Sequence, residues 1–102
     1  MKYQRSEQFR REFAQLSERE QRLFVAAVRA INEAWARHQG PGLPRWPAAL
    51  RMRPMVGHPG IWEMTWSFAG PDGRATFEFV EVDGEPASRW RRVGGRAIFD
   101  RP

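Results

Sequence analysis

Arginine recurs at alternate positions on one predicted face of the second half of the chain. Successive side chains of a β-strand point to opposite faces, so this alternation gathers the arginines on one side of a sheet. The arginines concerned are Arg51, Arg53, Arg74, Arg89 and Arg91. A guanidinium group is a planar fork that matches the geometry of phosphate oxygens. The spacing therefore predicts a surface that binds phosphates, opposite a face that packs.

Four short strands between residues 50 and 99 are predicted to hold these arginines. In residues 61–68, Trp62, Met64 and Trp66 point one way, while Glu63 and Thr65 point the other. Residues 74–79 repeat the scheme with alternate apolar side chains, as an antiparallel sheet with one packed face requires. Residues 57–60, 70–73 and 84–86 carry the glycines and prolines of turns between strands. Gly94 and Gly95 interrupt the last strand before residues 96–99.

Two helices are predicted to precede the strands and to cover the packed face. Phe9, Phe13 and Leu16 form one apolar stripe of a short helix. Ser17 and Glu20 have the spacing of a capping box, so a second helix begins there and continues to about His38. Such a tight connection predicts an antiparallel helical hairpin. Residues 3–6 either add a short edge strand or begin the first helix.

Composition predicts one α+β domain over residues 1–102. The 41% of hydrophobic residues suffices for a core, and no cysteine is present for a disulfide, a thiolate metal site or a thiol nucleophile. No segment approaches the about 18 apolar residues of a membrane span, and the N-terminus lacks the apolar core of a signal peptide. We therefore expect a cytoplasmic protein without a membrane partner. Because the net charge is +5 and every basic residue except Lys2 is arginine, we expect a nucleic-acid or acidic-protein partner.

The order of two helices followed by four strands, together with four segments, resembles the RelE/ParE toxin superfamily. Its members are the toxin halves of bacterial toxin–antitoxin pairs. The segments are residues 50–54, 60–64, 72–77 and 90–99, and the resemblance covers nearly the whole chain. It implies that a helical hairpin packs behind a four-stranded, mainly antiparallel sheet whose concave face is open.

The resemblance also implies an activity. RelE-like members cleave messenger RNA, usually on the ribosome, by attack of the 2′-hydroxyl on the adjacent phosphate, and they need no metal ion or other cofactor. Such chemistry requires cations around the phosphate, a proton acceptor for the 2′-hydroxyl and an acid for the leaving oxygen. On this basis Arg74 is the expected phosphate clamp, and Arg96 and Glu78 are the other expected catalytic residues.

Further residues are expected to bind RNA, namely Arg51, Arg53, Arg89, Arg91 and Phe99. Two of the carried-over positions depart from the family pattern, because Arg96 replaces the commoner His and Phe99 replaces the commoner Tyr. An arginine stays protonated and shuttles protons poorly, while a phenylalanine stacks on a base but relays no proton. Glu63 is an alternative proton acceptor, although an ion pair with Arg51 or Arg74 is the simpler expectation.

Two other functions fit the same scaffold. A ParE-like toxin would poison DNA gyrase by binding alone, although such relatives lack the basic set of Arg51, Arg53, Arg74 and Arg96. A protein that binds RNA or protein without cleavage is the third function, because His and Tyr are missing at positions 96 and 99. Each toxin reading implies a cognate antitoxin with an acidic segment that covers basic surface.

Overall fold

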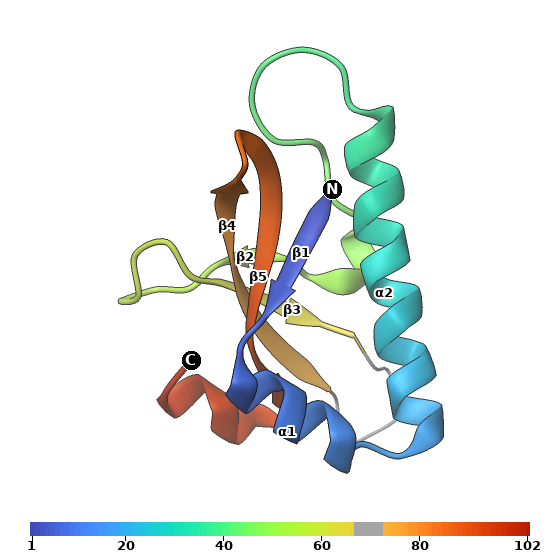
Figure 1. Cartoon of the computed structure of the whole chain (residues 1–102), viewed down its shortest axis with the longest axis vertical. Coiled ribbons are helices and arrows are strands. Elements are labelled where there is room, and N and C mark those ends of the chain that lie inside the picture. Colours follow the sequence, from blue (N-terminus) through green and yellow to red (C-terminus); the bar gives the residue numbers. More distant parts are fainter. Residues whose placement is uncertain (67–72) are drawn as a thin grey trace.

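A computed structural model describes residues 1–66 and 73–102, and for Arg96 it describes the backbone alone. The chain forms an α+β fold in which two helices accompany a five-stranded sheet (Figure 1). The helices are α1 (Glu7–Gln15) and α2 (Glu18–Arg37), and the short 3₁₀ helices are η1 (Ala48–Leu50) and η2 (Arg96–Asp100). The strands are β1 (Lys2–Arg5), β2 (Arg53–Pro54), β3 (Trp62–Thr65), β4 (Arg74–Val82) and β5 (Glu85–Gly94).

The sheet is mixed, with the order β1-β5-β4-β3-β2. Strands β2 to β5 pair antiparallel with their neighbours, whereas β1 pairs parallel with β5, so that Gln4 lies opposite Arg89. The mainly antiparallel sheet is therefore confirmed, and the edge strand left open by the sequence is the fifth strand. Its partner is the last strand of the chain, a pairing that no local pattern encodes.

The predicted helices are confirmed, and both begin at serine caps. Ser6 Oγ accepts a hydrogen bond from the Phe9 N–H at 3.0 Å. The capping box of α2 is complete, because the Glu20 N–H donates to Ser17 Oγ at 3.1 Å and the Ser17 N–H donates to Glu20 Oε1 at 2.8 Å. In Figure 1, α2 runs along the sheet, whereas α1 is steeply inclined to α2 and lies across the lower end of the sheet as drawn, so the two helices are not antiparallel.

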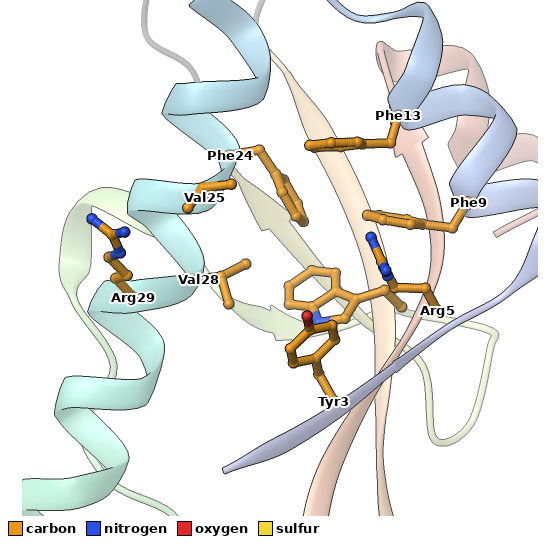
Figure 2. A pocket seen from close by; sticks show the side chains of 9 residues that line it. Tyr3, Arg5, Phe9, Phe13, Phe24, Val25, Val28 and Arg29 are labelled. Carbon is orange, nitrogen blue, oxygen red and sulfur yellow. The ribbon is translucent and has the colours of Figure 1, made fainter.

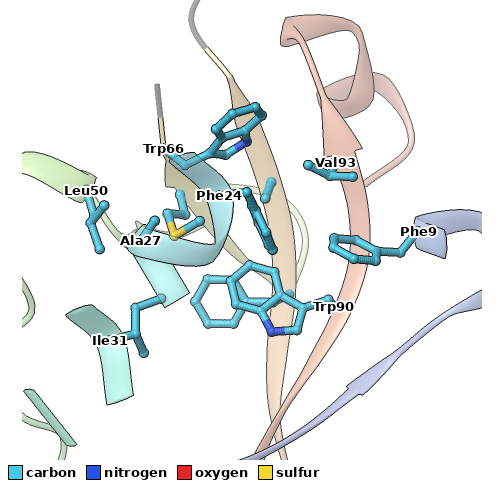
Figure 3. Close-up of a cluster of buried hydrophobic side chains, with 11 residues drawn as sticks. Phe9, Phe24, Ala27, Ile31, Leu50, Trp66, Trp90 and Val93 are labelled. Atoms are coloured by element: carbon cyan, nitrogen blue, oxygen red, sulfur yellow. The ribbon is translucent and has the colours of Figure 1, made fainter. Parts of the chain in front are cut away.

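Aromatic rings fill the core between the helices and the sheet (Figure 3). Phe24 of α2 makes edge-to-face contacts with Trp66 and Trp90, at ring-centroid distances of 5.9 and 5.2 Å. Phe77 of β4 lies 4.6 Å from Trp90. Trp66, Phe77 and Trp90 are all buried, so the apolar face predicted from the alternation is confirmed. The polar side chains of the same strands consequently point away from the helices.

The ends of the predicted strands are wrong in two places. Residues 96–99 form η2 rather than a strand, because the chain turns at Gly95 and Ile98 folds back against Gly94. The segment 50–53 is a strand only at Arg53, since Leu50 ends η1 and Arg51 adopts the left-handed conformation.

The turns are only partly as predicted. The last one occupies Asp83 and Gly84, so β5 already begins at Glu85. Of the turn predicted at 70–73, residues 70–72 lie outside the described residues. Gly73 is described, and a Cβ at this position would lie 2.3 Å from the Trp66 ring. Only glycine lets the backbone approach that ring so closely.

In the described part of the chain, no helix has the length and apolar character needed to span a bilayer.

Candidate phosphate-binding groove

A hollow on the polar face of the sheet brings together residues from well-separated segments. Its volume is about 550 Å³, and its walls come from the η1–β2 segment, β3, the start of β4, and η2. We call it the arginine groove, and its lining residues are Arg51, Met52, Arg53, Glu63, Thr65, Arg74 and Phe99. Among the described residues, three guanidinium groups therefore share one groove with one aromatic ring and one carboxylate.

Arg51 enters the groove from a strained backbone position. It follows η1 with φ 47° and ψ 42°, and its N–H donates to the Ala48 carbonyl at 3.2 Å. For a non-glycine residue this left-handed conformation is about 1–2 kcal/mol higher in free energy than a right-handed one. Such outliers gather at functional sites, where the surrounding fold holds a side chain in a required direction.

Arg53 and Glu63 face each other across the β2–β3 pair and form a hydrogen-bonded ion pair. The Arg53 side chain is 76% exposed, whereas the Glu63 side chain is only 14% exposed. The carboxylate is therefore fixed within the groove, while the guanidinium keeps donors that are open to solvent. Arg53 can contact an incoming phosphate with little rearrangement.

Arg74 is the most enclosed arginine of the groove, at 9% exposure. It begins β4 opposite Thr65 and Gly94, and its Nη1 donates to the Gly73 carbonyl at 3.2 Å. Phe99, which is half-buried in η2, lies on the wall of the same groove. A guanidinium beside an aromatic ring is an arrangement that can hold a phosphate and its adjoining base.

The remaining predicted residues gather at a second hollow on the polar face, with a volume of about 530 Å³. Arg89 and Arg91 line it together with His58, and Glu78 lies against both arginines. Glu78 Oε1 accepts a hydrogen bond from Arg89 Nη1 at 3.2 Å and lies 3.7 Å from Arg91 Nη1. A single carboxylate thus compensates part of the charge of these two arginines.

Arg92, to which the sequence assigned no role, is also held at the second hollow. Its Nε and Nη2 bind both oxygens of Glu12 from α1 at 2.7–3.0 Å. The hydrogen bonds that Arg92 donates to Glu12 raise the pKa of Arg92 above its already high value, so the group stays charged. This bidentate pair fastens α1 to β5 rather than serving a ligand.

The C-terminal segment, residues 96–102, separates the two hollows. The main-chain oxygen of Pro102 accepts from Thr76 Oγ1 at 3.4 Å and from Arg91 Nε at 3.0 Å, and Arg92 Nη1 donates to the Arg101 carbonyl at 2.8 Å. Thr76 is fully buried as a result. The polar face is therefore covered at its middle, and the wholly open face implied by the resemblance is not what this chain has.

The predicted site residues thus divide into two groups. Arg51, Arg53, Arg74 and Phe99 meet in the arginine groove, whereas Glu78, Arg89 and Arg91 meet at the second hollow. The side chain of Arg96 lies outside what the structure describes. Roles in catalysis or RNA binding remain predictions for all of them. Two further groove residues, Met52 and Thr65, were not singled out from the sequence. The alternation that places Glu63 on this face also places Thr65 there, whereas no sequence pattern indicates Met52.

Among the described residues, no three histidine, cysteine or acidic side chains gather closely enough to bind a metal ion. Comparison of the chain with protein-family models, with curated proteins and with solved structures gave no match.

Proposed function

We propose that this protein is the toxin of a bacterial toxin–antitoxin pair, a cytoplasmic, metal-independent endoribonuclease that cleaves messenger RNA on the ribosome. The observation that carries the proposal is the arginine groove, in which Arg51, Arg53, Arg74 and Phe99 converge from separate segments. Three cations and one ring in a single groove match the repeating phosphate and base of a single strand. The resemblance of residues 50–99 to RelE-like toxins supplies the reaction.

In this proposal Arg74 holds the phosphate that is attacked. It is the most enclosed cation of the groove, so its charge is screened least by water and acts most strongly on the pentacoordinate transition state. Arg51 and Arg53 are more exposed and contact the flanking phosphates. Phe99 stacks on a base beside the cleaved bond, which aligns the 2′-hydroxyl with the phosphorus atom.

Glu63 is the proposed proton acceptor. Of the carboxylates in the described part of the chain, Glu63 is the one that lines the groove, whereas Glu78 is engaged with Arg89 and Arg91 at the second hollow. The ion pair with Arg53 holds the Glu63 carboxylate at the wall of the groove. A phosphate that attracts Arg53 would draw the guanidinium from Glu63 and free a carboxylate lone pair for the 2′-hydroxyl proton.

The test is cleavage of a messenger RNA in a purified translation system. We expect cuts on ribosome-bound RNA that leave a 2′,3′-cyclic phosphate and a 5′-hydroxyl, unaffected by a metal chelator that leaves the ribosome intact. Glu63→Gln should slow cleavage by a hundredfold or more, the scale of general-base catalysis, whereas Glu78→Gln should not. Equal losses in both variants would refute the assignment of Glu63.

A second candidate is an RNA-binding protein that does not cleave. Two observations favour it. Glu63, the carboxylate of the groove, is ion-paired with Arg53, and among the described residues no histidine lines the groove. Binding of RNA in the groove with intact transcripts would support it. Inhibition of gyrase supercoiling without RNA cleavage would instead support a ParE-like function.

A cognate antitoxin is part of the proposal. The net charge of +5 and the exposed guanidinium groups of Arg51 and Arg53 suit an acidic segment that covers the groove. A neighbouring reading frame for a small acidic protein is expected. We expect that protein to co-purify with the unaltered chain. It should no longer co-purify with an Arg51→Glu/Arg53→Glu double variant if its acidic segment contacts these arginines.

A further inference from the structure

A separate cavity lies on the helix side of the sheet, between β1, α1 and α2 (Figure 2). Its volume is about 170 Å³. Aromatic side chains form most of its wall, and these are Phe9, Phe13, Phe24 and Trp90. Most of the wall is therefore apolar, although Arg5 and Arg29 also line the cavity.

The mouth of this cavity carries exposed apolar side chains beside a cation. Tyr3 is 57% exposed and Val25 is 43% exposed, although both are large hydrophobic residues. Figure 2 shows the Arg5 guanidinium beside Phe9, turned toward the cavity. Its Cζ lies 5.7 Å from the Tyr3 ring centroid, and within the described residues the guanidinium has no carboxylate or hydrogen-bond partner.

A polar hollow of about 510 Å³ adjoins the cavity and shares Tyr3 and Arg5 with it. Arg10 and Arg89 also line the hollow. Arg89 is held by Gln4 and Glu78, whereas the guanidinium of Arg10, like that of Arg5, has no partner in the described part of the chain. An apolar cavity thus opens directly onto two uncompensated positive charges.

We propose that this cavity binds a small amphiphilic anion with one aromatic ring and a carboxylate on a short chain. A cavity of about 150 Å³ lined by apolar side chains suffices to bind benzene, so a single ring fits the 170 Å³ found here. The carboxylate would lie at the mouth beside Arg5 and Arg10. The site is on the opposite side of the sheet from the arginine groove, so it does not depend on RNA cleavage.

The test uses 3-phenylpropionate as the probe, with calorimetry and amide NMR on the full chain. We expect saturable binding of one molecule, with the largest shift changes at Tyr3, Arg5 and Val28. The neutral 3-phenyl-1-propanol should bind about fivefold more weakly, the scale of one solvent-accessible ion pair. Propionate, which has the charge without the ring, should not bind.

A charge variant and a cavity-filling variant, with one control, test separately the contribution of the charge and that of the ring to binding. The double variant Arg5→Gln/Arg10→Gln should bind the acid and the alcohol equally, whereas Arg22→Gln, on the exposed side of α2, should keep the fivefold preference. Val28→Phe fills the cavity and should abolish binding of both while circular dichroism and melting confirm the fold. The proposal is overturned by an absence of saturable binding, by equal binding of acid and alcohol to the unaltered protein, by unchanged binding to Val28→Phe, or by binding only of a phenylalanine-containing acidic peptide.

Discussion

The left-handed backbone of Arg51 allows its side chain to be tested without loss of stability. Replacement by glycine removes the guanidinium and, at the same time, relieves a conformation that costs a non-glycine residue about 1–2 kcal/mol. Glycine also lowers the free energy of unfolding by about 0.5–1 kcal/mol, because it loses more backbone freedom on folding than other residues do. The net expectation for Arg51→Gly is an unchanged or slightly higher free energy of unfolding, by at most about 1.5 kcal/mol.

The loss in RNA affinity follows from counting phosphate contacts. For single-stranded RNA, each arginine–phosphate contact contributes about 0.7 to the negative slope of log affinity against log salt concentration. Contacts from Arg51, Arg53 and Arg74 predict a slope of about −2 for the protein. Arg51→Gly should lower its magnitude by about 0.7. If Arg89 and Arg91 also contacted RNA, the slope of the unaltered protein would be about −3.5.

The assay is a salt titration of binding to a 2′-O-methylated oligonucleotide, which cannot be cleaved by 2′-hydroxyl attack. Asp83→Gly is the matched control, because Asp83 also has a positive φ, 52°, in the turn after β4. It directly follows the far end of the nine-residue strand β4 that Arg74 begins, about 30 Å away along the strand and well beyond the screening length.

Both glycine variants should therefore match or exceed the unaltered protein in stability, and only Arg51→Gly should lose slope. An unchanged slope in Arg51→Gly would refute the contact between Arg51 and RNA.

Three further predictions concern the fold that holds the groove. Phe24→Ala should lower the free energy of unfolding by about 4 kcal/mol, measured by urea titration, because it empties the contact between two buried tryptophans; a loss below 1 kcal/mol would contradict this packing. Gly73→Ala should cost about 2 kcal/mol, since its Cβ would overlap the Trp66 ring, and an unchanged melting temperature would show that the ring is elsewhere. The backbone hydrogen bond from Ser17 lowers the pKa of Glu20 below 4.5, so its stabilising effect is present above pH 4.5 and is lost as the pH falls through the lower folded-state pKa; Glu20→Gln should remove that part of the acid dependence of stability.

Much of the fold could be predicted because its determinants are local. The capping box of Ser17 and Glu20 fixes the start of α2 within four residues of sequence, and the alternation in β3 and β4 identifies the buried face. The structure of residues 96–99 could not be predicted in this way, because the short apolar run 97–99 has no period that tells a strand from a helix. The 3₁₀ helix η2 is held in place by tertiary contacts. These are the contact of Ile98 with Gly94 and the hydrogen bonds from Arg91 and Arg92 to residues 101–102.

The candidate site was predictable in its residue types but not in its grouping. Alternation places Glu63 and Glu78 on one face, yet it does not say which arginine each carboxylate will meet. That depends on strand register, which sets Arg53 opposite Glu63 and Arg89 opposite Glu78. The cavity of Figure 2 likewise depends on β1 pairing with the last strand, which brings Arg5 beside the helices.

The most direct measurement is transcript end-mapping after the protein is expressed in growing bacteria, with Arg74→Ala and Arg22→Ala as paired variants. The account predicts growth arrest with new 5′ ends inside translated messages for the unaltered protein and for Arg22→Ala, and neither effect for Arg74→Ala when both variants are folded. Intact transcripts at full expression, or equal cleavage by Arg74→Ala, would contradict it.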